Sequence, residues 1–200
     1  MNLKTSMREE WLINATELSK NVFKQVGYSI PENIKLSCSY PSNGKGGKKK
    51  KALGQCIDTS ASAENNFNIL IHPEVSDKKE VLGILTHELV HATVGIKEGH
   101  NRVFKQCATS VGLEGKMTST TTGEKFDNLF SDVIKELPDY PHGSIILSDT
   151  DKKQTTRMLK LTCVNETGLI LRMSKGAYDN YGSPLCGCCN LPMELNEKGV

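Results

Sequence analysis

Long hydrophobic runs are absent from this chain of 200 residues. No stretch approaches the ~18 apolar residues that a membrane-spanning helix requires. Residues 1–20 are polar and charged, without the continuous apolar segment of a secretory signal. We therefore expect no membrane partner and a cytoplasmic location.

Charge of one sign is also scarce, because 25 Lys and Arg residues nearly balance 23 Asp and Glu residues. The resulting net charge of +2 does not by itself indicate a nucleic-acid partner. Hydrophobic residues make up 37% of the chain and charged residues 24%, as is typical of globular proteins. The length suits one domain of ordinary size and a small appendage.

A disulfide framework is not indicated either. The chain has seven cysteines, an odd number, and four of them lie in the last forty residues. Secreted disulfide-rich domains generally contain an even number of paired cysteines. The count and the clustering instead favour metal binding or free thiols.

An HExxH pattern formed by His87, Glu88 and His91 is the strongest functional signal in the sequence. Residues four apart in an α-helix lie one turn above each other on the same face, so both histidines can bind one metal ion. Glu88 lies ~100° around the helix from His87. From there its carboxylate can reach a water molecule at the metal rather than the metal itself, as a general base does.

His100 follows His91 by nine residues, in a turn expected between two helices. It is the candidate third ligand, because three protein ligands leave the fourth position of a tetrahedral zinc ion open for water, as in catalytic sites. The metzincin pattern is excluded, since Val94 and Lys97 stand where it requires Gly and His. We therefore expect Zn²⁺ as the cofactor.

Hydrophobic periodicity predicts the elements around this motif. We expect helices over residues 7–26, 77–95, 101–111 and 126–137. Three short strands, 34–40, 52–57 and 67–71, are expected to form an antiparallel sheet in which the second strand pairs with the first. Residues 116–123, rich in Thr and Ser, predict a loop bordering the cleft.

Between the first two strands lies a loop rich in glycine and lysine, with four consecutive lysines: Lys48, Lys49, Lys50 and Lys51. Glycines and lysines of this kind are typical of a solvated hairpin tip. The functional alternative is contact with a phosphate backbone, in which each lysine adds a salt-sensitive interaction.

Tyr140 and His142 flank Pro141 after the last predicted helix. Zinc proteases need a hydrogen-bond donor near the developing oxyanion, and either side chain could supply one if this segment crosses the metal. The alternative is that both are ordinary turn residues beside the proline.

The motif and its surroundings resemble the SprT-like zinc metallopeptidases, the family that includes Spartan, and especially its bacteriophage members. The resemblance covers most of the chain. It rests on a leading helix with a Trp and on the segments 54–56, 67–73, 87–92, 98–100, 112–117 and 140–143, together with Phe104. It implies that His87, His91 and His100 bind the catalytic zinc and that Glu88 is the catalytic glutamate.

Residues and resemblance together predict an α+β chain of two domains. Residues 1–140 are expected to form a zincin-like metallopeptidase domain with an N-terminal helix, a small three-stranded sheet and the HExxH helix. Residues 141–156 are expected to be a linker, and residues 157–200 a small zinc-ribbon-like β domain with strands at 159–163 and 169–173.

The ribbon has an incomplete set of cysteines. Cys186 and Cys189 have the spacing of a zinc knuckle, and Cys163 lies about twenty residues earlier. Position 166, where the bacteriophage relatives have another cysteine, is Glu166. Three interpretations remain open: Glu166 is the fourth ligand of a second zinc ion, Cys188 replaces it, or the ribbon has lost its metal.

These observations predict a zinc-dependent endopeptidase whose protein substrates could be associated with DNA. An excess of Lys and Arg over acidic residues between positions 151 and 175 agrees with a nucleic-acid contact. The alternative is a zinc-stabilised nucleic-acid-binding or regulatory protein without proteolytic activity. A third interpretation is a hydrolase of small amides. A purely structural site has no need of Glu88, which favours an enzyme.

Overall fold

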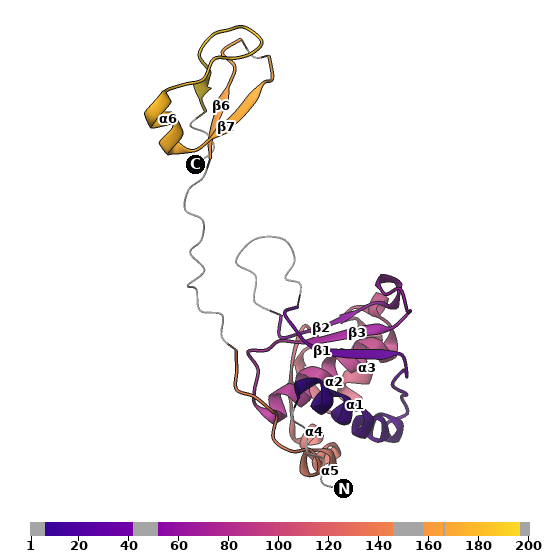
Figure 1. Cartoon of the computed structure of the whole chain (residues 1–200). Coiled ribbons are helices and arrows are strands. Elements are labelled where there is room, and N and C mark those ends of the chain that lie inside the picture. Colours follow the sequence, from indigo (N-terminus) through magenta and orange to yellow (C-terminus); the bar gives the residue numbers. More distant parts are fainter. Residues whose placement is uncertain (1–6, 42–51, 146–157, 166, 197–200) are drawn as a thin grey trace. The chain divides into compact units, whose positions relative to one another are not determined.

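The computed structural model describes residues 7–41, 52–145, 158–165 and 167–196 (Figure 1). Two compact units divide the chain, Met1–Ile146 and Leu147–Val200. Their boundary lies within the segment 141–156 that we expect to be a linker. Both units contain helices and small sheets, which confirms the α+β class.

The first unit begins with α1 (Arg8–Gln25), close to the predicted range. Its buried apolar side chains recur at helical spacing, as Trp11, Ala15 and Val22 illustrate. The indole Nε1 of Trp11 donates a hydrogen bond to the carbonyl oxygen of Pro138 over 2.9 Å. This bond ties the start of the unit to its end.

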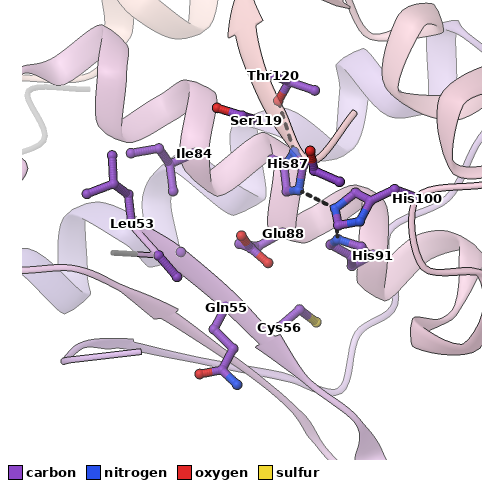
Figure 2. Close-up of a pocket in the computed structure, with 13 residues that line it drawn as sticks. Leu53, Gln55, Cys56, Ile84, His87, Glu88, His91, His100, Ser119 and Thr120 are labelled. Carbon is purple, nitrogen blue, oxygen red and sulfur yellow. Dashed lines mark hydrogen bonds between the residues drawn. The ribbon is translucent and has the colours of Figure 1, made fainter. Parts of the chain in front are cut away.

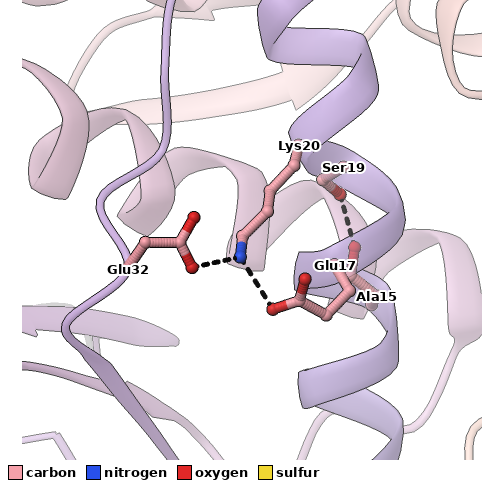
Figure 3. Close-up of polar contacts among 5 residues, drawn as sticks. All are labelled: Ala15, Glu17, Ser19, Lys20 and Glu32. Carbon is pink, nitrogen blue, oxygen red and sulfur yellow. Dashed lines mark hydrogen bonds and ion pairs between the residues drawn. The ribbon is translucent and has the colours of Figure 1, made fainter.

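Lys20 fixes α1 to the segment that leads into the first strand (Figure 3). Its Nζ lies 2.9 Å from Glu17 Oε1 and 2.6 Å from Glu32 Oε2. The hydrogen bonds that Lys20 donates to the Glu32 and Glu17 carboxylates raise the pKa of Lys20. Because both carboxylates are exposed, solvent screening leaves this contact a small part in stability.

The sheet of the first unit contains β1 (Ile34–Cys38), β2 (Gly54–Ile57) and β3 (Phe67–Ile71) in the order β1-β3-β2. β3 is antiparallel to β2 but parallel to β1, so the prediction of an antiparallel sheet with the second strand beside the first is wrong. β3 is the most apolar of the three strands, and its Ile69 and Ile71 are fully buried. It therefore occupies the centre, which leaves β2 at one edge.

The HExxH residues lie on α2 (Lys78–Val94). Asp77 caps the helix, because its Oδ1 accepts a hydrogen bond from Glu80 N over 2.8 Å. Leu82, Leu85 and Leu89 are fully buried, and α2 packs against β2 and β3. The apolar face thus anchors the helix and leaves its other side for the site.

Gly95 ends α2 with φ 94° and ψ 138°. Glycine readily adopts such a positive φ, and the ψ lies outside the left-handed helical region. The short 3-10 turn η2 (Ile96–Glu98) then leads to α3 (Arg102–Ser110). Asn101 caps α3, since its Oδ1 accepts from Val103 N over 2.8 Å. A second 3-10 turn, η1 (Thr59–Ala61), precedes β3.

Residues 113–122 form a hairpin of β4 (Leu113–Lys116) and β5 (Ser119–Thr122), so the prediction of a loop over 116–123 is wrong. The strand was missed because its residues are Ser and Thr, without alternation of apolar and polar residues. Gly83 of α2 makes room for it: a Cβ atom there would lie 2.8 Å from Thr122 Cγ2. The hairpin therefore packs directly on α2.

The helix predicted over 126–137 is two helices, α4 (Glu124–Leu129) and α5 (Ser131–Glu136). They part at Phe130, whose φ of −95° and ψ of 8° depart from helical values. The ring of Phe130 is fully buried and stacks on Phe126, with 4.1 Å between the ring centroids.

The second unit contains β6 (Leu159–Thr162), β7 (Ile170–Met173), α6 (Lys175–Tyr181) and β8 (Glu194–Leu195). The first two strands were predicted and are antiparallel, whereas α6 and β8 were not expected. The strand order is β7-β6-β8. Leu161, Cys163, Cys186 and Met193 form its small buried core. Within the described part of the chain, no helix is long and apolar enough to cross a membrane.

Candidate active site

Three histidine rings converge at the end of α2, as the sequence predicts (Figure 2). His100 Nε2 lies 3.2 Å from His87 Nε2 and 3.2 Å from His91 Nε2. One nitrogen from each ring lies within 4.8 Å of those of the other two rings. The spacing allows all three nitrogens to bind one metal ion.

The protonation of the histidines agrees with metal binding. Burial, together with the neighbouring imidazoles, lowers the pKa of His87 to about 3 and that of His91 to about 4. Burial also lowers the pKa of His100. All three rings are therefore neutral at pH 7, and only a neutral imidazole can bind a metal.

Phe104 of α3 closes the back of the cluster. Its ring centroid lies 5.0 Å from that of His87, 4.4 Å from that of His91 and 4.9 Å from that of His100. Phe104 is fully buried. This apolar wall restricts the rotation of the imidazoles and keeps water from that side of the site.

Glu88 lies beside the histidines but does not belong to the group of candidate ligands. Its carboxylate is on the β2 side of the site (Figure 2), where it accepts a hydrogen bond from the Cys56 backbone N–H. Glu88 is only 6% exposed, and burial raises the pKa of its carboxyl to about 8. It therefore holds a proton more tightly than a solvated glutamate, as a general base near neutral pH requires.

Gly54 at the start of β2 makes the position of Glu88 possible. A Cβ atom at position 54 would lie 2.5 Å from Glu88 Oε1 and 2.7 Å from Ile84 Cγ2. No real Cβ atom makes such close contacts, so only glycine leaves room for the buried carboxylate. The sequence gives one signal of this, since a glycine in a strand often marks a close approach.

We expect Gly54→Ala to lower the free energy of unfolding by about 1–3 kcal/mol, as overpacking of a tight site does. Chemical denaturation measures this difference. Gly143→Ala is the matched control, because a Cβ atom there meets nothing within 4 Å. Equal stability of the two variants would contradict the tight contact between Gly54 and Glu88.

The cleft in front of the histidines has a volume of about 460 Å³. One wall comes from the segment before β2 and from β2 itself, including Leu53 and Cys56, and the opposite wall comes from the hairpin, including Thr120. Ile84 and the HExxH residues of α2 lie between these walls (Figure 2). Glu88 is the only Asp, Glu, Lys or Arg among the described residues that line the cleft.

Tyr140 and His142, the candidate oxyanion donors, are not among the residues that line this cleft. Tyr140 is buried against Trp11, with 5.1 Å between the ring centroids. His142 lines a different cavity, at the start of α1, together with Arg8. Arg8 fixes this segment by donating hydrogen bonds to the carbonyl oxygens of Pro141 and Gly143.

Three cysteines gather in the second unit. Cys163 Sγ lies 3.5 Å from Cys189 Sγ, and with Cys186 Sγ these atoms lie within 4.8 Å of one another. Cys188 remains exposed and outside the group, because its backbone N–H is the part that points inward, donating to Cys186 Sγ over 3.4 Å.

Hydrogen bonds to sulfur prepare these cysteines for a metal. The Thr167 hydroxyl and the backbone N–H groups of Asn165 and Thr167 lower the pKa of Cys163 to about 6. The backbone N–H of Leu191 also donates to Cys189, but burial and the neighbouring Cys163 and Cys186 thiols raise the pKa of Cys189. Thiolates are the metal-binding form of cysteine, so the donor set fits a metal ion.

Two groups of predicted residues lie outside the described part of the chain: Lys48 to Lys51 and Glu166. The structure thus brings together His87, Glu88, His91 and His100 in one place, and Cys163, Cys186 and Cys189 in another. Comparison with known proteins found no matching family model, no similar curated protein and no similar solved structure.

Proposed function

We propose that this chain is a zinc-dependent endopeptidase of the SprT-like type. One observation carries the proposal: three neutral imidazole nitrogens converge in an open cleft beside a buried carboxylate that is not itself a ligand. This is the arrangement that metal-assisted hydrolysis requires. A site that only stabilised the fold would have no use for Glu88 at that position.

His87, His91 and His100 would hold the zinc ion. When bound, zinc polarises a carbonyl group and makes water more acidic. Glu88 then takes the proton of the attacking water and passes it to the leaving amine. Burial raises the pKa of Glu88 above that of a solvated glutamate, which makes its carboxylate a stronger proton acceptor.

The shape of the cleft favours a peptide over a small amide. β2 is an edge strand of its sheet and forms one wall of the cleft, and edge strands can pair with an extended peptide. The uncharged walls select no charged side chain next to the bond that is cut. We therefore infer an endopeptidase with little preference for charged residues at the cleavage site.

Digestion of a peptide mixture tests this inference. Mass spectrometry of the products should show cleavage at internal bonds, and zinc removal by a chelator should abolish it until zinc is added back. Release of small amides without internal cleavage would favour the hydrolase of small amides. Zinc binding without any hydrolysis would favour the nucleic-acid-binding alternative.

We further propose that Cys163, Cys186 and Cys189 hold a second, structural zinc ion in a ribbon. Two observations support this proposal: the three sulfur atoms lie close together, and backbone N–H groups donate hydrogen bonds to them. The donor at the fourth position is left open.

Cys186→Ser should therefore lower the zinc content by one ion per chain and lower the melting temperature of the second unit. Zinc analysis by mass spectrometry and thermal denaturation measure both effects. Cys188→Ser is the matched control, since Cys188 is exposed and outside the cluster. If Cys186→Ser kept the wild-type zinc content, this site would have to be abandoned.

A further inference from the structure

The hairpin of β4 and β5 contacts one of the three histidines directly. His87 Nδ1 lies 2.9 Å from Thr120 Oγ1, and Figure 2 shows this bond on the side of the ring opposite the Nε2 that faces His100. Thr120 comes from β5, about thirty residues further along the chain than His87. No sequence pattern links the two.

This contact can stabilise the tautomer of His87 that carries its proton on Nδ1. A neutral imidazole has one N–H, and it can bind a metal through Nε2 only if the proton is on Nδ1. The Thr120 hydroxyl can accept the Nδ1–H bond, since a hydroxyl oxygen has two lone pairs. Acceptance at Oγ1 therefore leaves Nε2 free and directed at the other two rings.

His91 provides a contrast within the same site. Its Nδ1 is buried and has no hydrogen-bond partner among the described residues. Phe104 packs on both His87 and His91, so apolar packing alone does not distinguish them. Of these two ligands, only His87 has a hydrogen-bond partner at Nδ1 among the described residues.

The position of Thr120 does not depend on this bond. Thr122, on the same strand, packs so closely on α2 that a Cβ atom at Gly83 would lie 2.8 Å from its Cγ2. β5 also pairs with β4 along its whole length. The hydroxyl is thus presented to His87 by a strand that is anchored independently.

We propose that Thr120 is a positioning residue that sets the zinc affinity of the catalytic site by fixing the tautomer and the orientation of His87. The inference rests on the proposed function, because it assumes that the three histidines bind zinc. Loss of a hydrogen-bond partner to a metal-binding histidine typically weakens metal binding ~10- to 100-fold. Thr120→Val removes the hydroxyl and keeps the shape of the side chain.

The experiment titrates the full-length protein with Co²⁺ and then competes Co²⁺ with Zn²⁺ in the presence of a chelator. Absorption from sulfur-to-metal charge transfer separates an ion at the cysteines from one at the histidines. Thr120→Val should bind zinc at the histidines ~10- to 100-fold more weakly than wild type. Thr120→Ser should restore the affinity, because serine keeps the accepting oxygen.

Thr121→Val is the matched control, since Thr121 is an exposed neighbour on the same strand. It should bind zinc as wild type does. The ¹⁵N spectrum of the metal-free protein adds a readout of the ring: the Nδ1–H tautomer of His87 should dominate in wild type and lose that dominance in Thr120→Val. If the valine variant unfolds, Thr120→Ala gives the same comparison without a bulky apolar side chain.

Each outcome decides a separate point. Equal zinc affinity at the histidines in wild type and Thr120→Val would overturn the role of Thr120 and leave the proposed function intact. Equally weak binding in Thr120→Ser and Thr120→Val would also overturn it, because the hydroxyl would then be irrelevant. Absence of zinc from the histidines in wild type would instead contradict the proposed function.

Discussion

Glu88→Gln is expected to slow peptide cleavage by about 10²- to 10⁴-fold, the contribution typical of a general base. Glutamine has nearly the same shape as glutamate but cannot take a proton from water. The Glu88 carboxylate is buried and outside the group of candidate ligands. The zinc content of the variant should therefore equal that of wild type.

Initial rates on a fluorogenic peptide, measured at equal zinc content, give this ratio. Glu74→Gln serves as the control, because Glu74 lies on the segment after β3 and does not line the cleft. Its rate should match that of wild type. A Glu88→Gln enzyme that retains more than about a tenth of the wild-type rate would show that another group takes the proton.

His91→Ala is expected to abolish both zinc binding at the cleft and proteolysis. The variant keeps two of the three converging nitrogens, and two ligands hold zinc far more weakly than three. The loss of zinc affinity should exceed the ~10- to 100-fold loss that follows removal of a hydrogen-bond partner of a ligand. Rates at saturating zinc and zinc content by mass spectrometry measure it.

The metal-free form of His91→Ala should remain folded. In the wild-type chain, Nδ1 of His91 is buried and has no hydrogen-bond partner among the described residues. Removing the imidazole therefore breaks no hydrogen bond at Nδ1. His142→Ala is the matched control, because His142 lines a cavity other than the cleft. Loss of activity in His142→Ala would revive an oxyanion role for that residue, and zinc-dependent activity in His91→Ala would exclude His91 as a ligand.

The sequence was sufficient for the local part of the site. Helical spacing alone places His87 and His91 on one face, and the turn after Gly95 brings His100 to them. The caps at Asp77 and Asn101 are likewise local, since capping depends on a few neighbouring residues. These features involve contacts between residues close in the chain.

Contacts between distant residues were not predictable in the same way. Alternation identifies a strand but not its partner, which is why the parallel pairing of β1 with β3 was missed. The fit of Gly54 to Glu88 and the bond from His87 to Thr120 join residues more than thirty positions apart. Nothing in the segment around Tyr140 reveals that Trp11 packs on its ring.

The most direct measurement is a gel digestion of a DNA-binding protein by wild type and by Glu88→Gln, each loaded with zinc and assayed with and without single-stranded DNA. We predict internal fragments of the substrate, and products of self-cleavage, in the wild-type lanes alone. Fragments that depend on DNA would link the activity to DNA-associated substrates. Identical fragments from both proteins, or none from either while both carry zinc at the histidines, would contradict a Glu88-dependent protease.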